Sequence, residues 1–86
     1  MTVTTYDFQM VASRAVAALR EEFGVDAGIF AEPGYQGRVR IKVVSPNLNG
    51  IPHEEQQEVI WRRLRAALGD DAQGISVVIA YGTDEL

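Results

Sequence analysis

The feature that most constrains the fold of this chain is a two-residue alternation of side chains over residues 38–44. The apolar positions are Val39, Ile41 and Val43, and the cationic positions are Arg38, Arg40 and Lys42. Successive side chains of a β-strand point to opposite faces of the sheet. The pattern therefore predicts a strand over 38–45 with one face in a core and the other in water.

The segments after this strand predict a crossover unit. Apolar side chains recur with helical spacing over about 53–68, and the inward positions are Ile60, Leu64, Ala67 and Leu68. Residues 75–81 are mostly apolar and predict a third strand. A strand, a helix and a strand connected in this order form a right-handed unit with parallel strands.

A first helix is predicted over residues 5–23. Its apolar side chains return every three or four positions, at Phe8, Val11, Ala12, Ala15, Leu19 and Phe23. Thr4 or Thr5 is expected to cap its start, with Asp7 near the positive end of the helix dipole. Gly24 is expected to end it.

A hairpin completes the predicted fold. Residues 25–32 predict a strand joined to 38–45 by the turn Glu32–Gly37, which contains Pro33 and two glycines. The expected fold class is α/β (α+β), in the order helix–strand–strand–helix–strand. Its three-stranded mixed sheet would carry both helices on one face and leave the other face open.

Two large aromatic residues fall within these elements. In the third strand, Ile75, Val77, Ile79 and Tyr81 share one face by alternation, so Tyr81 is expected in the core. Trp61 lies at the edge of the inward stripe of its helix. It is compatible with a place in the core and with a role as an anchor for a partner.

Size and composition limit the class of function. With 86 residues, the chain is expected to form one domain over 1–86. It has no cysteine, which excludes disulfides, thiolate metal sites and cysteine nucleophiles. The net charge of -4 disfavours general nucleic-acid binding. No secretory signal is evident at the N-terminus and no apolar run reaches the roughly 20 residues needed to cross a bilayer, so a cytoplasmic protein without membrane contact is expected.

Residues 38–68 resemble the BolA family. The strand is followed by a serine, then a leucine two residues before a glycine, and then a helix with an aromatic residue and two spaced leucines. These residues are Ser45, Leu48, Gly50, Trp61, Leu64 and Leu68. The ending Ala80–Leu86, an aromatic residue followed by Thr and an acidic residue, is also similar. The resemblance implies a BolA-like fold, a variant of the type II KH arrangement.

The resemblance also bears on cofactors and partners. BolA proteins that share an iron–sulfur cluster with a monothiol glutaredoxin use a helix histidine and a Cys or His in the hairpin loop. Here Gln57 stands at the histidine position, and the turn Glu32–Gly37 contains neither ligand. An amide is a poor iron ligand beside imidazole or thiolate. No cofactor is therefore expected, and a glutaredoxin would be bound through surface contact alone.

The leading hypothesis is a non-enzymatic adaptor or regulatory domain that binds a protein. Its candidate binding residues lie on the predicted open face, in the 45–53 loop and on the second helix: Phe30, Arg38, Arg40, Lys42, Ser45, Asn49, His53, Gln57 and Trp61. The stripe of three cations has a simpler explanation as a solvated face paired with Asp26 and Glu32. A KH-like nucleic-acid surface, to which Arg62, Arg63 and Arg65 would contribute, is the first alternative.

The sequence gives little support to an enzyme. The only histidine, His53, could hold a metal or carry a proton, but no carboxylate partner is evident and an exposed polar role is favoured. The paired carboxylates lie at helix ends, and nothing places two of them across a cleft. The serines have no neighbouring histidine to activate them.

Overall fold

A computed structural model describes residues 7–86 of the chain. The elements are α1 (Phe8–Phe23), β1 (Gly28–Pro33), β2 (Val39–Ser45), α2 (His53–Leu68) and β3 (Ile75–Gly82), with four short 3-10 segments between and after them. This order confirms the prediction. Over the described residues, no helix is both long enough and apolar enough to cross a membrane.

Helix α1 begins one residue after its cap. The Asp7 side chain accepts a hydrogen bond from the Met10 backbone N–H at 3.2 Å, which satisfies one of the free donors of the first turn. The predicted caps Thr4 and Thr5 lie outside the described residues. The helix ends at Gly24, whose φ of 82° is readily adopted only by glycine.

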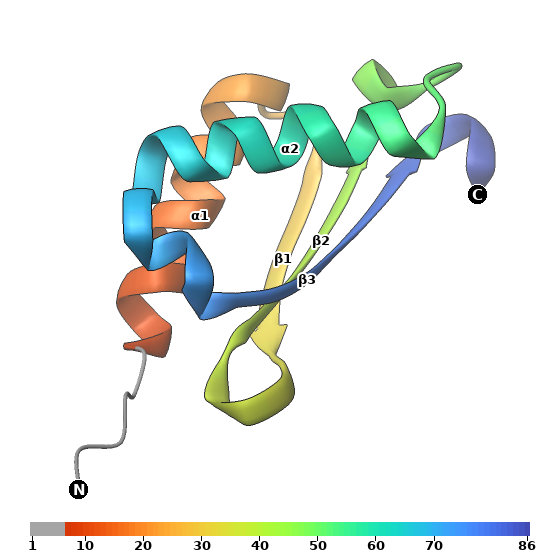
Figure 1. Cartoon of the computed structure of the whole chain (residues 1–86). Coiled ribbons are helices and arrows are strands. Elements are labelled where there is room, and N and C mark those ends of the chain that lie inside the picture. The colour runs from red at the N-terminus through yellow and green to blue at the C-terminus, as the bar shows by residue number, and fades with distance from the viewer. Residues whose placement is uncertain (1–6) are drawn as a thin grey trace, which may run out of the picture.

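The sheet has the order β1-β2-β3, with β1 antiparallel to β2 and β2 parallel to β3. Figure 1 shows α1 and α2 on one side of it and, among residues 7–86, no element on the other. The core lies between these two layers. Its fully buried members include Ala15, Leu19, Val39, Ile41, Val43, Ile60 and Leu64. The predicted two-layer fold with both helices on one face is confirmed, and the described part of the chain leaves the other face bare.

The side chains of β3 point to different faces of the sheet than the sequence predicted. Val39 pairs with Ile75, but Arg40 pairs with Val77, so the register shifts at Ser76. Such a bulge reverses the alternation of side chains. Ile75 therefore points into the core, and Val78 and Ala80 follow it there. Val77, Ile79 and Tyr81 lie on the open face, and the prediction of Tyr81 as a core residue was wrong.

Candidate protein-docking surface

The side of the sheet away from the helices carries three rows of side chains, here called the open face. The strand register gives the rows as Gly28, Val44 and Tyr81, then Phe30, Lys42 and Ile79, then Glu32, Arg40 and Val77. Residues paired across strands share a face, so each row runs from β1 to β3. The alternation over residues 38–44 places Val44, Lys42 and Arg40, all on β2, in the middle of these three rows.

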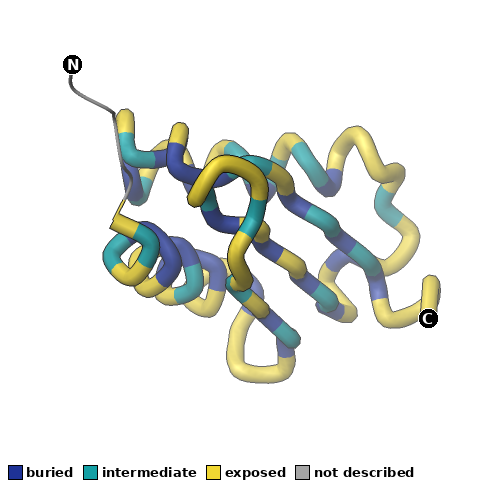
Figure 2. The backbone as a smooth tube through the Cα atoms, turned by 90° about the horizontal axis from the view of Figure 1, so that it is seen from below, coloured by how far each residue is buried: buried dark blue, intermediate teal, exposed yellow. Residues whose placement is uncertain are grey.

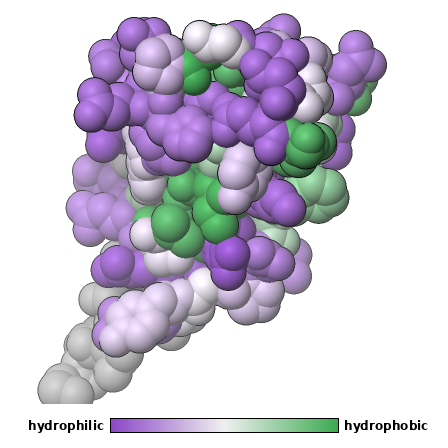
Figure 3. All heavy atoms as spheres, turned by 90° about the vertical axis from the view of Figure 1, so that its right-hand side faces the viewer, coloured by the Kyte–Doolittle hydropathy of each residue, from purple (hydrophilic) through white to green (hydrophobic). Residues whose placement is uncertain are grey.

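The apolar side chains of the open face are Phe30 on β1, Val44 on β2, and Val77 and Ile79 on β3. Phe30 is 55% exposed and Val77 is 42% exposed, and Val44 and Ile79 are half-buried. Seen from below, the strands alternate between buried and exposed residues (Figure 2). The space-filling view shows hydrophobic surface in the middle of a mostly hydrophilic side (Figure 3). Exposed apolar surface that gathers in one place is characteristic of binding sites.

The predicted cationic stripe is only partly available for a partner. Arg40 and Glu32 form an ion pair at 3.3 Å, with both side chains about half exposed. This is the pairing that the simpler explanation required, and at such exposure it stabilises the fold little. Lys42 has no ion pair with any residue of the described part of the chain. It is exposed at the centre of the open face.

A hollow of about 510 Å³ adjoins the open face at the hairpin end. Its lining includes Tyr35, Arg38, Arg40 and Val77. Arg38 is half-buried where the hairpin turn meets β2, and Tyr35 is 75% exposed. The stripe therefore continues from the centre of the open face toward this hollow.

Two candidate residues of the 45–53 loop serve the fold. Ser45 is fully buried, and its hydroxyl accepts the backbone N–H of Asn47 at 3.1 Å. Asn49 donates to the Thr83 hydroxyl at 2.9 Å and accepts the Asp84 backbone N–H at 3.1 Å. Both side chains shape the loop or tie it to the C-terminal segment. Ser45 is therefore closed to a partner, whereas Asn49 is exposed but already engaged within the chain.

His53 has a carboxylate partner that the sequence did not reveal. Its Nε2 lies 2.6 Å from Glu85 Oε2. Glu85 Oε1 also accepts from Gln56 Nε2 at 2.9 Å and from the Gly82 backbone N–H at 3.2 Å. The bond to His53, then that from Gln56, then that from Gly82 lower the pKa of Glu85 to about 2. The group holds the chain end against α2.

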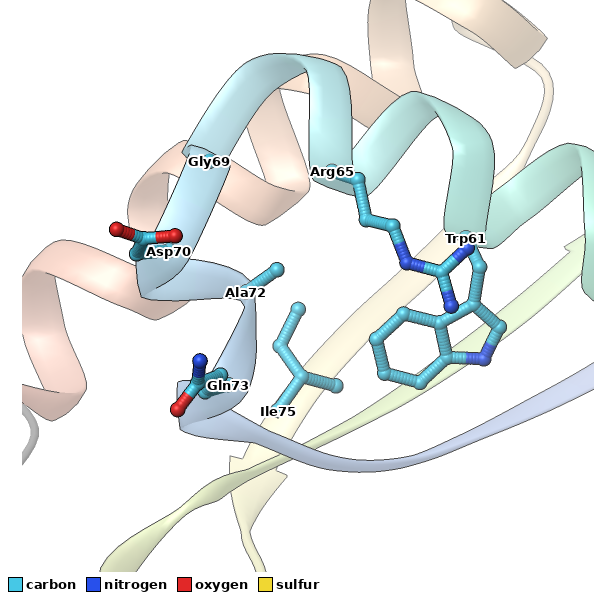
Figure 4. A pocket seen from close by; sticks show the side chains of 7 residues that line it. All are labelled: Trp61, Arg65, Gly69, Asp70, Ala72, Gln73 and Ile75. Carbon is cyan, nitrogen blue, oxygen red and sulfur yellow. The ribbon is translucent and has the colours of Figure 1, made fainter.

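Gln57 and Trp61 form a chain of hydrogen bonds along the outer edge of β3. Gln57 Nε2 donates to the Val78 carbonyl at 2.9 Å, and Trp61 Nε1 donates to Gln57 Oε1 at 3.1 Å. The half-buried Trp61 packs against the core, which resolves the position that the sequence left open. Figure 4 shows the Arg65 guanidinium over its ring, 5.6 Å from the centroid.

These contacts decide whether the site fits an iron–sulfur cluster. Gln57, the residue that the sequence resemblance aligns with the ligand histidine, has an amide side chain whose donor and acceptor groups are both engaged within the chain. His53 is held by Glu85. The residues present at this position do not fit cluster ligation of the kind that the resemblance describes.

The arginines of α2 do not extend the cationic stripe. Arg62 pairs with Glu58 at 3.0 Å. Arg63 donates to the Ala18 carbonyl at 3.3 Å and pairs with Glu21 at 2.8 Å, so it joins α2 to α1. These side chains belong to the helical layer, whereas the stripe faces away from it. The two sets do not form one basic surface.

The fold and the bare sheet face define the class of this chain: it has a BolA-like fold. Among solved structures it resembles BolA1 from Arabidopsis thaliana, with a TM-score of 0.70 and 19% sequence identity, over 88% of this chain and 95% of that chain. No family model matches the sequence, and no curated protein matches it significantly. The likeness concerns the fold, so function is argued from the site.

Proposed function

We propose that this protein is a non-enzymatic adaptor or regulatory domain that binds a protein partner through its open face. The observation that carries the proposal is the exposed apolar surface around Lys42. Phe30 and Val77 are exposed large hydrophobic residues, and cross-strand neighbours connect them through the middle of the sheet. A few side chains that become fully buried in a well-packed interface supply most of its affinity.

The contacts of the polar residues support binding in place of catalysis. His53 and Glu85, the closest histidine–carboxylate pair, bind each other and hold the C-terminal segment. Among the described residues, the hollow beside His53 is lined by glutamines, apolar residues and Tyr81, with no serine or lysine. The 45–53 loop, which was the other candidate surface, is occupied by contacts to residues 83–85. The open face is therefore the better docking surface.

Two alternatives concern the identity of the partner. The resemblance makes a monothiol glutaredoxin the first protein to test, bound through surface contact without ligation by Gln57. Nucleic acid is less well supported, because the α2 arginines are engaged in the helical layer and Arg40 is paired with Glu32. Phosphate contacts would also make binding fall steeply with salt, whereas an apolar interface would not.

The test compares two variants of the full chain in affinity capture from source lysate, followed by binding of the purified partner. The double variant Phe30→Ser with Val77→Ser removes the outer anchors of the open face. Val25→Ser is the matched control, because Val25 is 88% exposed and lies outside the sheet. We expect the double variant to lose at least about tenfold in affinity and the control to bind like the unmodified chain.

Loss of affinity in both variants, or in neither, would contradict the proposal. Replacement of the captured protein by oligonucleotides, with binding that collapses between low and moderate salt, would favour the nucleic-acid alternative. Thermal unfolding of each variant confirms that the fold is retained.

A further inference from the structure

We infer that the partner element seated on the open face is an amphipathic α-helix that places a carboxylate against Lys42. This inference rests on the proposed docking function and specifies the partner's structure and charge. Three observations carry it: the state of the sheet edges, the size of the open face, and the distribution of charge on it.

The edges of the sheet disfavour a partner that adds another strand. On β3, Gln57 Nε2 donates a hydrogen bond to the Val78 carbonyl, and Glu85 Oε1 accepts one from the Gly82 N–H. These side-chain groups stand where the amides of an added strand would bind. The β1 edge ends in Pro33, which has no N–H to donate. A partner is therefore better placed to contact the face than to extend the sheet.

The dimensions of the open face suit one helix. Three strands at spacings of about 4.8 Å, with three outward side chains on each, cover roughly 10 by 13 Å. A helix is about 10 Å wide and rises about 1.5 Å per residue, so two to three turns cover this surface. Helices on both faces of a sheet form a common three-layer arrangement. Here α1 and α2 already cover one face (Figure 1).

The charge on the open face sets the chemistry of that helix. Lys42 is the only lysine of the chain and stands in the central row between Phe30 and Ile79. No carboxylate within residues 7–86 pairs with it. An apolar partner would bury this ammonium group without compensation, which is costly. A carboxylate on the partner would pair with it and fix the register of the helix.

A second copy of the chain fits the open face poorly. Two copies meeting face to face would bring two Lys42 ammonium groups toward the centre of one interface. Each copy also carries a net charge of -4, which repels the other at longer range. We therefore place the carboxylate on a molecule other than a second copy of this chain.

The experiment uses the full chain and two designed helical peptides. The acidic peptide has about 18 residues, enough for appreciable helicity, with a leucine stripe at helical spacing flanked by glutamates. The basic peptide has a lysine at each glutamate position. Each peptide is titrated by ¹H–¹⁵N NMR into the unmodified chain and into Lys42→Glu, with Val25→Ser as the control variant.

The inference predicts that Lys42→Glu reverses which of the two peptides binds more tightly. The acidic peptide shifts the amides of the open face in the unmodified chain and binds roughly tenfold more weakly to Lys42→Glu, whereas the basic peptide gains affinity for that variant. Shifts confined to α1 or α2, equal binding of both peptides, or no binding of the acidic peptide would overturn the helical partner. Formation of a dimer by the chain alone in sedimentation would overturn it in favour of a second copy. Capture that depends on Phe30 and Val77 would in each case still support the proposed function.

Discussion

At the scale of single residues, one carboxylate organises the C-terminal end of the domain. Glu85 accepts hydrogen bonds from His53, Gln56 and the Gly82 backbone N–H. Gln56 is buried and also donates to the carbonyls of Leu48 and Ile51. Residues far apart in sequence therefore meet at one side chain, and the start of α2, the preceding loop and the chain end are held together.

The shifted pKa of Glu85 predicts a dependence of stability on pH. The pKa is lowered from 4.5 to about 2 in the folded protein. The folded state therefore prefers the ionised form, and the stabilisation is fully present above pH 4.5 and is lost as the pH falls toward 2. Glu85→Gln lacks this ionisation. We expect its thermal midpoint to lie below that of the unmodified chain at pH 6 and the two to converge by about pH 2.

Circular dichroism melts across this range measure the difference. The control Glu54→Gln changes an exposed carboxylate in the first turn of α2 that is outside this cluster. A gap between Glu85→Gln and the unmodified chain that stays constant down to pH 2 would contradict the assignment.

At the scale of elements, spacing predicted the order and type of every helix and strand, but not the facing of β3. The period of β2 is uninterrupted, and its buried and exposed positions follow the sequence directly. In β3, the shift at Ser76 depends on how two strands pair across the α2 crossover. No local pattern encodes it. For this reason Tyr81, which was predicted for the core, lies on the open face with Val77 and Ile79.

The role of Gln57 also belongs to the scale of elements, because its side chain covers the outer edge of β3. Gln57→Leu removes the donor to the Val78 carbonyl and the acceptor of Trp61 Nε1. We expect a loss of about 1–3 kcal/mol in the free energy of unfolding, since both groups lose their partner. Denaturant unfolding followed by the fluorescence of Trp61, the only tryptophan, measures it.

The exposed edge should also favour pairing with a second chain. Sedimentation velocity should therefore show association of Gln57→Leu that grows with concentration. Val59→Ala, on another side of α2, is the control. Unchanged stability together with a strictly monomeric Gln57→Leu would contradict the role of Gln57 as an edge cap.

At the scale of the whole molecule, the sequence predicted a layered domain and a surface, while the contacts within the candidate site required coordinates. The alternation over 38–44 placed Arg40 and Lys42 on the open face correctly. The sequence offered pairing of the stripe with Glu32 as one explanation without deciding it, and it did not show that Ser45 and Asn49 are engaged in the loop. The Asn49 contacts join the loop to residues 34 and 35 positions further along the chain, and the Ser45 contact is a local turn bond, so neither produces a periodic pattern in the sequence.

The proposal of a docking surface rests on the uneven distribution of charge and apolar surface over the molecule. The chain is acidic as a whole, yet the centre of its bare sheet face is apolar with one lysine. The helical layer, by contrast, carries arginines that are paired with Glu21, Glu58 and Asp71. A molecule built in this way keeps one uncovered surface on which a partner can bury apolar side chains.

The most direct test of this claim is the reactivity of Lys42 toward an amine-specific acylating reagent, with and without the purified partner. Because the chain has one lysine, mass spectrometry can follow that amine separately, and a lysine peptide added to the same mixture serves as the internal control. The account predicts that the partner slows acylation of Lys42 by at least about tenfold, as expected for an amine buried in an interface core, and leaves the rate of the added peptide unchanged. An unchanged rate at Lys42 in the saturated complex would contradict it.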